Sequence, residues 1–274
     1  MRKVFSILVL AVLALVLSAC WPAEVGVETH FNADGSGTRV IIIDVMDDLL
    51  STTPITNPDD PDGTEGKGAV LNDKHVDGGV IAIQAWLEAN APSFMTVHDP
   101  EVAGYHRYFK MSFDFSSFDD FLDKYEQLVN LSPNLSWSDF DADEKPTLEV
   151  TGGLTRTLTF KESRAIVEAS LDWAIDGIWN DIYDEADLAG FVTKADISAL
   201  ANYTVTIGDG EYEELRHYDP NAVDGDGTGK VIFVENDSFT VVGQATNVGL
   251  LVGIIVGAVA VIAGGVFLVL KLKK

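Results

Sequence analysis

The amino-acid sequence predicts an α+β fold, in which a mostly antiparallel sheet has helices packed on one face and is followed by a C-terminal transmembrane helix. Three observations support this prediction. Extended runs with alternating apolar residues occur in blocks that are joined by short glycine turns. Between these blocks, two segments repeat apolar residues every three or four positions, as amphipathic helices do. A long uncharged stretch then precedes the final lysines.

The N-terminal segment has the build of a secretory signal peptide, with two basic residues followed by an apolar run over residues 4–17. The segment closes on Leu17, Ser18, Ala19 and Cys20, which resembles a bacterial lipobox. That resemblance implies cleavage before Cys20 and a covalent diacylglycerol-type lipid on its thiol. An uncleaved signal anchor and a buried structural cysteine are the alternatives, but the run is shorter than the ~20 residues that span a bilayer. Residues 1–19 are therefore predicted to be a lipoprotein signal peptide.

The charge of the chain limits its partners. Five of the 18 basic residues lie in the two terminal segments, which leaves 13 to face all 43 acidic residues. Such an acidic surface repels phosphate backbones and argues against a nucleic-acid partner. Cys20 is the one cysteine, so its lipidation would exclude an intrachain disulfide and leave stability to the core.

The first block of the mature chain is a predicted hairpin. Residues 25–31 alternate as a strand, with Val25, Val27, Thr29 and Phe31 on one face. The turn over residues 34–38 (Asp-Gly-Ser-Gly-Thr) returns the chain into a run rich in β-branched residues that ends at residue 46.

The lipobox, this strand, its turn and its return strand together resemble the start of the LppM-type lipoproteins of Gram-positive bacteria. That family also carries a C-terminal transmembrane helix, and the order of elements extends the resemblance over most of the chain. The resemblance implies an exported α/β domain that is linked to envelope lipids or glycolipids.

The middle of the chain begins with residues 51–78, whose prolines, glycines and acids without periodicity predict an exposed loop. A short helix follows and ends near Pro92. Residues 105–115 then alternate as a half-buried strand. Ser116 and Ser117 are candidate N-caps for an amphipathic helix over 118–130.

The second half begins with a predicted hairpin, in which a Gly-Gly pair joins residues 148–150 to 154–160. Helical spacing then predicts one long helix from Glu162 to about Tyr183. Further strands are predicted over residues 202–207, 211–217, 230–234 and 239–242.

Residues 248–270 carry no charge and are long enough to cross a hydrocarbon core of ~30 Å. Lys271, Lys273 and Lys274 follow at once and place residues 271–274 in the cytoplasm by the positive-inside rule. The sequence therefore predicts a single-pass helix with its C-terminal end inside the cell.

Within this span Gly249, Gly253 and Gly257 fall on one helix face, where small residues allow another helix to approach closely. A homotypic or heterotypic helix contact is one interpretation. The other is that glycine is simply common in membrane helices.

The sequence offers no catalytic constellation. It has no Gly-x-Ser-x-Gly elbow, no phosphate-binding glycine loop and no zinc-binding helix motif. The five histidines are scattered: His30, His75, His98, His106 and His217. The protein is therefore predicted not to be an enzyme and to need no cofactor other than its lipid.

Calcium is a weak alternative for the Asp-rich turns. An EF-hand loop needs acids at positions one, three and five, glycine at six and Glu at twelve. Loops built around Gly63 and Gly227 match the middle positions but lack the first acid and the final Glu. The metal ligands, if any, stay unknown.

These features predict a doubly membrane-tethered lipoprotein, with an extracytoplasmic domain over residues 20–247. The first hypothesis for its function is a non-enzymatic binding module for an envelope lipid or glycolipid. The candidate surface is the apolar side of the sheet with the helices over 118–129 and 167–182, although the same residues also fit a plain core. The alternative is a structural or interaction protein, which engages an envelope protein through its acidic surface and the glycine-faced helix.

Overall fold

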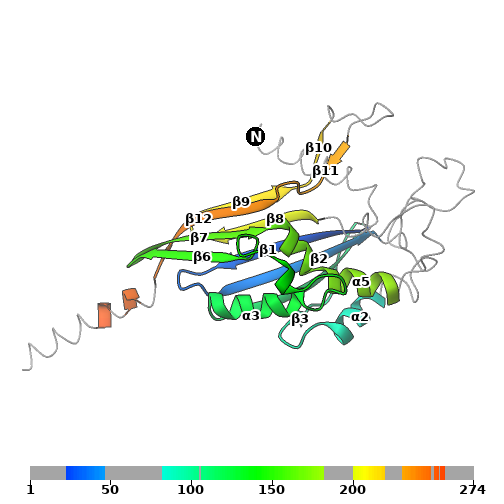
Figure 1. Ribbon diagram of the computed structural model, residues 1–274, viewed down its shortest axis with the longest axis horizontal. Coiled ribbons are helices and arrows are strands. Elements are labelled where there is room, and N and C mark those ends of the chain that lie inside the picture. The colour runs from blue at the N-terminus through cyan, green and yellow to red at the C-terminus, as the bar shows by residue number, and fades with distance from the viewer. Residues whose placement is uncertain are drawn as a thin grey trace, which may run out of the picture.

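The computed structural model describes residues 23–46, 82–104, 106–181, 200–219, 230–247, 250–252 and 254–256. They form a mixed α and β structure whose strands are mostly antiparallel (Figure 1). The helices α2, α3 and α5 gather along one side of the strands (Figure 1).

The larger sheet has seven strands, in the order β3-β5-β2-β1-β8-β9, with β4 also paired to β5. Every pair is antiparallel except β1 with β8, which are parallel although they lie far apart in the sequence. The predicted mostly antiparallel sheet is thus confirmed. The strands are β1 (Ala23–Phe31), β2 (Gly37–Met46), β3 (Thr96–Val97), β4 (Glu101–Ala103), β5 (His106–Phe115), β8 (Leu200–Ile207) and β9 (Gly210–Leu215).

A second sheet of three strands shares the covered face with the helices, which the sequence did not predict. It consists of β6 (Thr147–Gly152), β7 (Thr155–Ser163) and β12 (Ser238–Thr246), in the order β12-β7-β6. Phe160 of β7 lies 4.7 Å from Phe31 of β1, and Phe239 of β12 stacks on Tyr203 of β8 at 3.8 Å between ring centroids. These aromatic contacts join the two sheets face to face. A further pair, β10 (His217–Asp219) with β11 (Lys230–Ile232), stands apart.

The helices complete the layer over the large sheet. Their buried residues belong to one hydrophobic core with those of both sheets. The predicted helices near residues 80–91 and 118–130 are confirmed. The helical elements are α2 (Ala82–Asn90), α3 (Phe118–Val129), the short 3-10 helix η3 (Trp137–Asp139), α4 (Arg164–Ala169) and α5 (Asp172–Asp181).

The predicted single helix from Glu162 to Tyr183 is wrong, because the segment forms the end of a strand and then two helices. Glu162 and Ser163 still belong to β7, and α4 is separated from α5 by a break at Ser170. The Ser170 hydroxyl donates to the carbonyl of Val167 at 2.6 Å, a local bond of the kind that competes with a continuing helix. Tyr183 lies outside the described residues.

The first hairpin forms as predicted, with β1 and β2 paired over their whole length. Gly35 has φ 85°, a conformation that glycine adopts without steric cost. The Asp34 carboxylate accepts hydrogen bonds from the backbone and hydroxyl of Ser36, and these bonds lower the pKa of Asp34. The turn is therefore fixed by its own residues.

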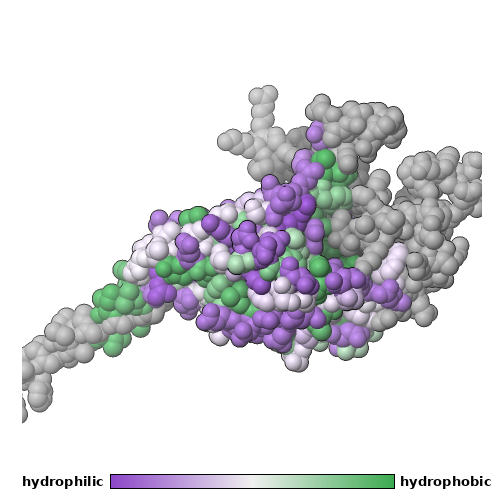
Figure 2. All heavy atoms as spheres, in the orientation of Figure 1, coloured by the Kyte–Doolittle hydropathy of each residue, from purple (hydrophilic) through white to green (hydrophobic). Residues whose placement is uncertain are grey.

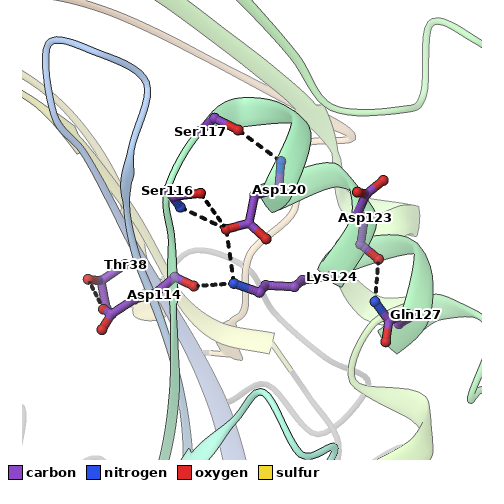
Figure 3. A network of polar contacts seen from close by, with 8 residues as sticks. All are labelled: Thr38, Asp114, Ser116, Ser117, Asp120, Asp123, Lys124 and Gln127. Atoms are coloured by element: carbon purple, nitrogen blue, oxygen red, sulfur yellow. Dashed lines mark hydrogen bonds and ion pairs between the residues drawn. The ribbon is translucent and has the colours of Figure 1, made fainter.

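The start of α3 is also fixed locally. The Ser117 hydroxyl accepts from the backbone N–H of Asp120, as an N-cap does. Figure 3 shows Asp120 reaching back to Ser116, while the Lys124 ammonium contacts both Asp120 and the carbonyl of Asp114. The backbone N–H of Ser116, followed by Lys124, lowers the pKa of Asp120. This network connects β5 to α3 without a linker.

A buried ion pair links the two sheets. Arg39 of β2 points into the core, where its two terminal nitrogens donate to the Glu162 carboxylate of β7 at 3.1 and 3.2 Å. The exposed fractions of the two side chains are 1% and 0%. The Tyr203 hydroxyl also donates to Glu162, and the Arg39 guanidinium lies 4.6 Å from the ring of Tyr125. Burial disfavours the charged form of Arg39, but Glu162 offsets this and holds the pKa of Arg39 above its ordinary value.

We predict that Arg39→Met lowers the free energy of unfolding by about 3–5 kcal/mol, because it leaves the Glu162 carboxylate buried without its cation. The double variant Arg39→Met/Glu162→Leu should recover most of this loss, since no buried charge is left unpaired. Urea denaturation of the three proteins measures both effects.

Arg164→Met is the control for an exposed pair, because the carboxylates that it contacts, Asp237 and Glu168, are exposed at 92% and 52% and exposed pairs contribute about 1 kcal/mol or less. Arg164 also donates to the carbonyl of Val234 at 3.0 Å, so its loss sets an upper limit for an exposed pair. If Arg39→Met costs no more than this control, the buried pair does not hold the sheets together.

Candidate functional site

The anchors predicted from the sequence lie outside the described residues. This holds for the lipobox with Cys20, for Gly249, Gly253 and Gly257, and for Lys271, Lys273 and Lys274. It also holds for the loop over residues 51–78 and for residues 220–229 around the second Asp-rich turn. Of the predicted span, residues 250–252 and 254–256 are described, and they are helical. No helix within the described part of the chain is both long and apolar enough to cross a bilayer.

The apolar face that the sequence offered as a lipid-binding surface is core. Phe121, Tyr125 and Leu128 of α3 are fully buried, as is Val167 of α4. Phe121 packs 5.0 Å from Phe115 of β5, measured between ring centroids. The same side chains therefore cannot also line a lipid cavity, and the lipid-binding version of the function needs another surface.

Such a surface exists on the opposite side of the large sheet. Along β1, Val25 and Val27 point into the core, so Glu24, Gly26 and Glu28 point to the other side. The pairing register places neighbours beside them on the same side: Ile42 and Asp44 from β2, Tyr108 and Lys110 from β5, and Asn202 from β8. We call this set the open face.

A hollow of about 250 Å³ lies on the open face, and Gly26 is one of the residues that line it. A side chain at this position would stand between Asn202 and Ile42, whose Cβ atoms lie 3.6 and 3.8 Å from the place of a Cβ on Gly26. The hollow therefore exists because one strand position lacks a side chain. Glu101 of β4 closes its edge beside Lys110.

Ion pairs hold the charged groups of the hollow in place. The Lys110 ammonium lies 2.8 Å from Glu101, and Nδ1 of His106 lies 2.7 Å from the Asp44 carboxylate. Arg216, which follows β9, contacts Glu24. These contacts fix the side chains before any ligand arrives, so binding would cost little ordering of the site.

Glu24 has a strongly altered acidity. Its exposed fraction is 6%. Burial raises the pKa of Glu24 to about 7, and Asp44 adds to the rise, while Arg216 and His106 act against it. A buried carboxyl group that titrates near neutral pH in a hollow is a candidate functional group.

The lining of the hollow favours a ligand that donates hydrogen bonds. Carboxylates dominate it, with the amide of Asn202 as a mixed partner and Lys110 as the single ammonium donor. The ring of Tyr108 and the side chain of Ile42 supply apolar surface. Within the ranges that the structure describes, no cluster of three or more His, Cys, Asp or Glu could hold a metal ion.

Three of the described histidines, His30, His98 and His106, have individual polar partners. His30 contacts Thr206 at 2.9 Å, and His98 contacts Ser112 at 2.7 Å. His106 is buried beside Asp44 and is the one of these three that contacts a residue lining the hollow.

Comparisons with known proteins give little to place beside this site. Neither the protein-family models nor the curated proteins include a match to the chain. Among solved structures, the NMR structure of the folded domain of LppM from Mycobacterium tuberculosis matches 83% of this chain and 91% of that domain, with 11% sequence identity and a TM-score of 0.26. This is a distant structural match, and the resemblance stated from the sequence stays a prediction.

The sequence alone did not reveal the hollow. Its residues come from five strands, and Gly26 reads as an ordinary position in an alternating strand. The available signal was a glycine between two acidic positions of the same face, Glu24 and Glu28.

We predict that the stability of the protein falls as pH rises from about 4.5 to about 7, in part through Glu24. The folded state holds the Glu24 proton to a higher pH than the unfolded chain, for which the ordinary pKa is 4.5. The Glu24→Gln variant should therefore gain stability relative to the wild type across this window, by up to about 3 kcal/mol.

Urea denaturation at a series of pH values measures this difference, with Glu28→Gln as the control on the same strand face. A difference between Glu24→Gln and wild type that stays constant with pH would show that Glu24 titrates normally.

Proposed function

We propose that this protein is a membrane-tethered, non-enzymatic binding domain, and that its open face holds a sugar headgroup of an envelope glycolipid. The observation that carries the proposal is the hollow at Gly26, with its pre-ordered carboxylates, one ammonium group and one aromatic ring. Sugar hydroxyls both donate and accept hydrogen bonds, and the apolar side of a sugar ring packs on aromatic side chains.

The size of the hollow agrees with one sugar unit rather than a lipid chain. Pockets for drug-sized ligands hold about 300–1,000 Å³. The hollow is smaller, at about 250 Å³, and the apolar interior of the domain is filled by its own side chains. The proposal therefore keeps the glycolipid version of the predicted function and moves its site from the apolar face to the open face.

The proposed double tether would hold the strands close to the membrane. The chain from Cys20 to the start of β1 at Ala23 reaches about 10 Å when extended. The C-terminal segment leaves from the opposite end of the molecule (Figure 1), and the 9 residues of β1 extend about 30 Å. With both anchors engaged, the strands must lie inclined toward the membrane plane rather than upright.

We predict that Gly26→Val abolishes sugar binding without unfolding the protein. A Cβ at Gly26 meets its neighbours at ordinary contact distances, and valine favours strands. The test is an NMR titration of the full chain in detergent micelles with methyl glucoside and with glucosamine, following the amides of Gly26, Ile42 and Lys110.

The wild type should show concentration-dependent shifts of these amides, and Gly26→Val should show none at the same sugar concentration. Thr206→Val, on the same side of the sheet but outside the hollow, is the matched control and should bind as the wild type does. The proposal would be contradicted if the chemical shifts of these amides do not change in the wild type, or if they change by the same amount in Gly26→Val.

A further inference from the structure

The turn between β6 and β7 is joined directly to the start of the C-terminal helical segment. The backbone N–H of Asn247 donates to the carbonyl of Leu154 in that turn at 2.8 Å. Asn247 then begins the helical turn, because its side-chain oxygen accepts from the N–H of Leu250 at 3.0 Å and its carbonyl accepts from Leu251 at 2.9 Å. Asn247 is therefore bonded both to the β6–β7 turn and to the first described residues of the helical segment.

Apolar side chains are exposed on both sides of this junction. Val150 and Leu154 of the hairpin are exposed at 43% and 41%. Leu250 is exposed at 42% and Ile255 at 54%. Figure 2 shows hydrophobic atoms gathered where the ends of β6, β7 and β12 meet the described helical turns. We call Val150, Leu154, Leu250, Val252 and residues 254–256 the tip surface.

The tip surface stands out from the rest of the molecule by its charge. The chain has 43 acidic residues, yet none falls between Val150 and Lys161 or after Asp237. The two charged residues of the hairpin segment, Arg156 and Lys161, are basic. Arg156 lies next to the turn, paired with Gly152, whereas Lys161 lies at the other end of β7, paired with Thr147. An apolar turn with a basic residue beside it is compatible with a membrane that carries anionic lipids.

Two acidic turns lie near the tip surface and are set back from it. The turn that contains Asp34 lies beside Arg156, because Arg156 donates to the carbonyl of Ala33 at 3.0 Å. Asp209 accepts from the backbone N–H of Gln244 at 2.6 Å. The hairpin turn and Asn247 lie farther along their strands than these two acidic turns, by about 10 Å for Asn247 past Gln244.

We propose that the tip surface is a lipid-contacting surface, which seats the β6–β7 turn in the interfacial layer of the bilayer beside the C-terminal helix. Exposed apolar patches of this kind mark interaction sites, and burial of such side chains at the interface is favourable. The occupant is lipid because the helical segment continues as an uncharged sequence to Leu270 and ends in three lysines. This inference concerns a different surface from the open face and does not depend on a sugar ligand.

The experiment uses the full chain with Cys20→Ser, which has no other cysteine. Single cysteines are introduced at Leu154, at Ile255 and at Leu131, and each is labelled with an environment-sensitive fluorophore. Leu131 follows α3 away from the tip surface and is exposed at 49%, so it is the matched control. The proteins are reconstituted in vesicles of phosphatidylcholine and phosphatidylglycerol.

Labels at Leu154 and Ile255 should be quenched by lipids that carry a nitroxide near the headgroup or along the acyl chain, and should be several-fold less accessible to aqueous iodide than the label at Leu131. In one contradicting outcome, iodide quenches the label at Leu154 as strongly as the label at Leu131, while the label at Ile255 is quenched by lipid. This result would show that the helix enters the bilayer but that the β6–β7 turn does not, and it would contradict the proposal. Shielding of Leu154 from iodide without quenching by lipid would assign the surface to a protein contact and would also overturn the proposal.

Discussion

The buried pair of Arg39 and Glu162 connects the two sheets and thereby decides which surface of the large sheet is left open. Arg39 occupies an inward position of β2, and its charge is compensated by a carboxylate from β7 at 3.1 and 3.2 Å. In the low dielectric of the core the two charges attract each other strongly. Removing either one would leave the other charge buried without a partner, which lowers the free energy of unfolding. Because the second sheet and the helices are held on the inner face, the outer face carries the hollow.

This arrangement separates two surfaces along β1. The hollow at Gly26 lies toward the start of the strand, whereas the tip surface lies beside the turn that follows its end at Phe31. Lys110 contacts Glu101, and Nδ1 of His106 contacts Asp44, on the first surface. At the second surface, the backbone N–H of Asn247 donates to the carbonyl of Leu154. One domain can thus present a polar hollow and an apolar tip.

Local features of the fold could be predicted from the sequence, because neighbouring residues encode them. The hairpin of β1 and β2 follows from strand alternation around Asp34 and Gly35, and α3 follows from its apolar spacing and from Ser117. Contacts between distant residues could not be predicted. Both faces of β2 carry apolar residues, so nothing in its pattern marks Arg39 as buried, and the parallel pairing of β1 with β8 joins segments far apart in the chain.

The missing contacts between distant residues also explain two wrong predictions, the single helix that starts at Glu162 and the lipid-binding face of the helices. The apolar spacing after Glu162 fits a helix, but Glu162 belongs to a strand that pairs with Phe239 of β12, far later in the chain. Its side chain meets Arg39, which lies more than a hundred residues earlier. The assignment of the helices to a lipid-binding face failed for a related reason. A helical apolar stripe is the same whether it faces a ligand or a second sheet, and here Phe160 of that sheet fills the space.

The central claim is that the shared aromatic core, with the buried pair inside it, makes the two sheets one cooperative unit. Native-state hydrogen exchange of the full chain in micelles tests it most directly, because it gives an opening free energy for each strand. The account predicts that the slowest amides of β7 and β12 exchange with the same free energy as those of β1 and β2. Exchange of the three-stranded sheet at a clearly lower free energy than the large sheet would contradict it.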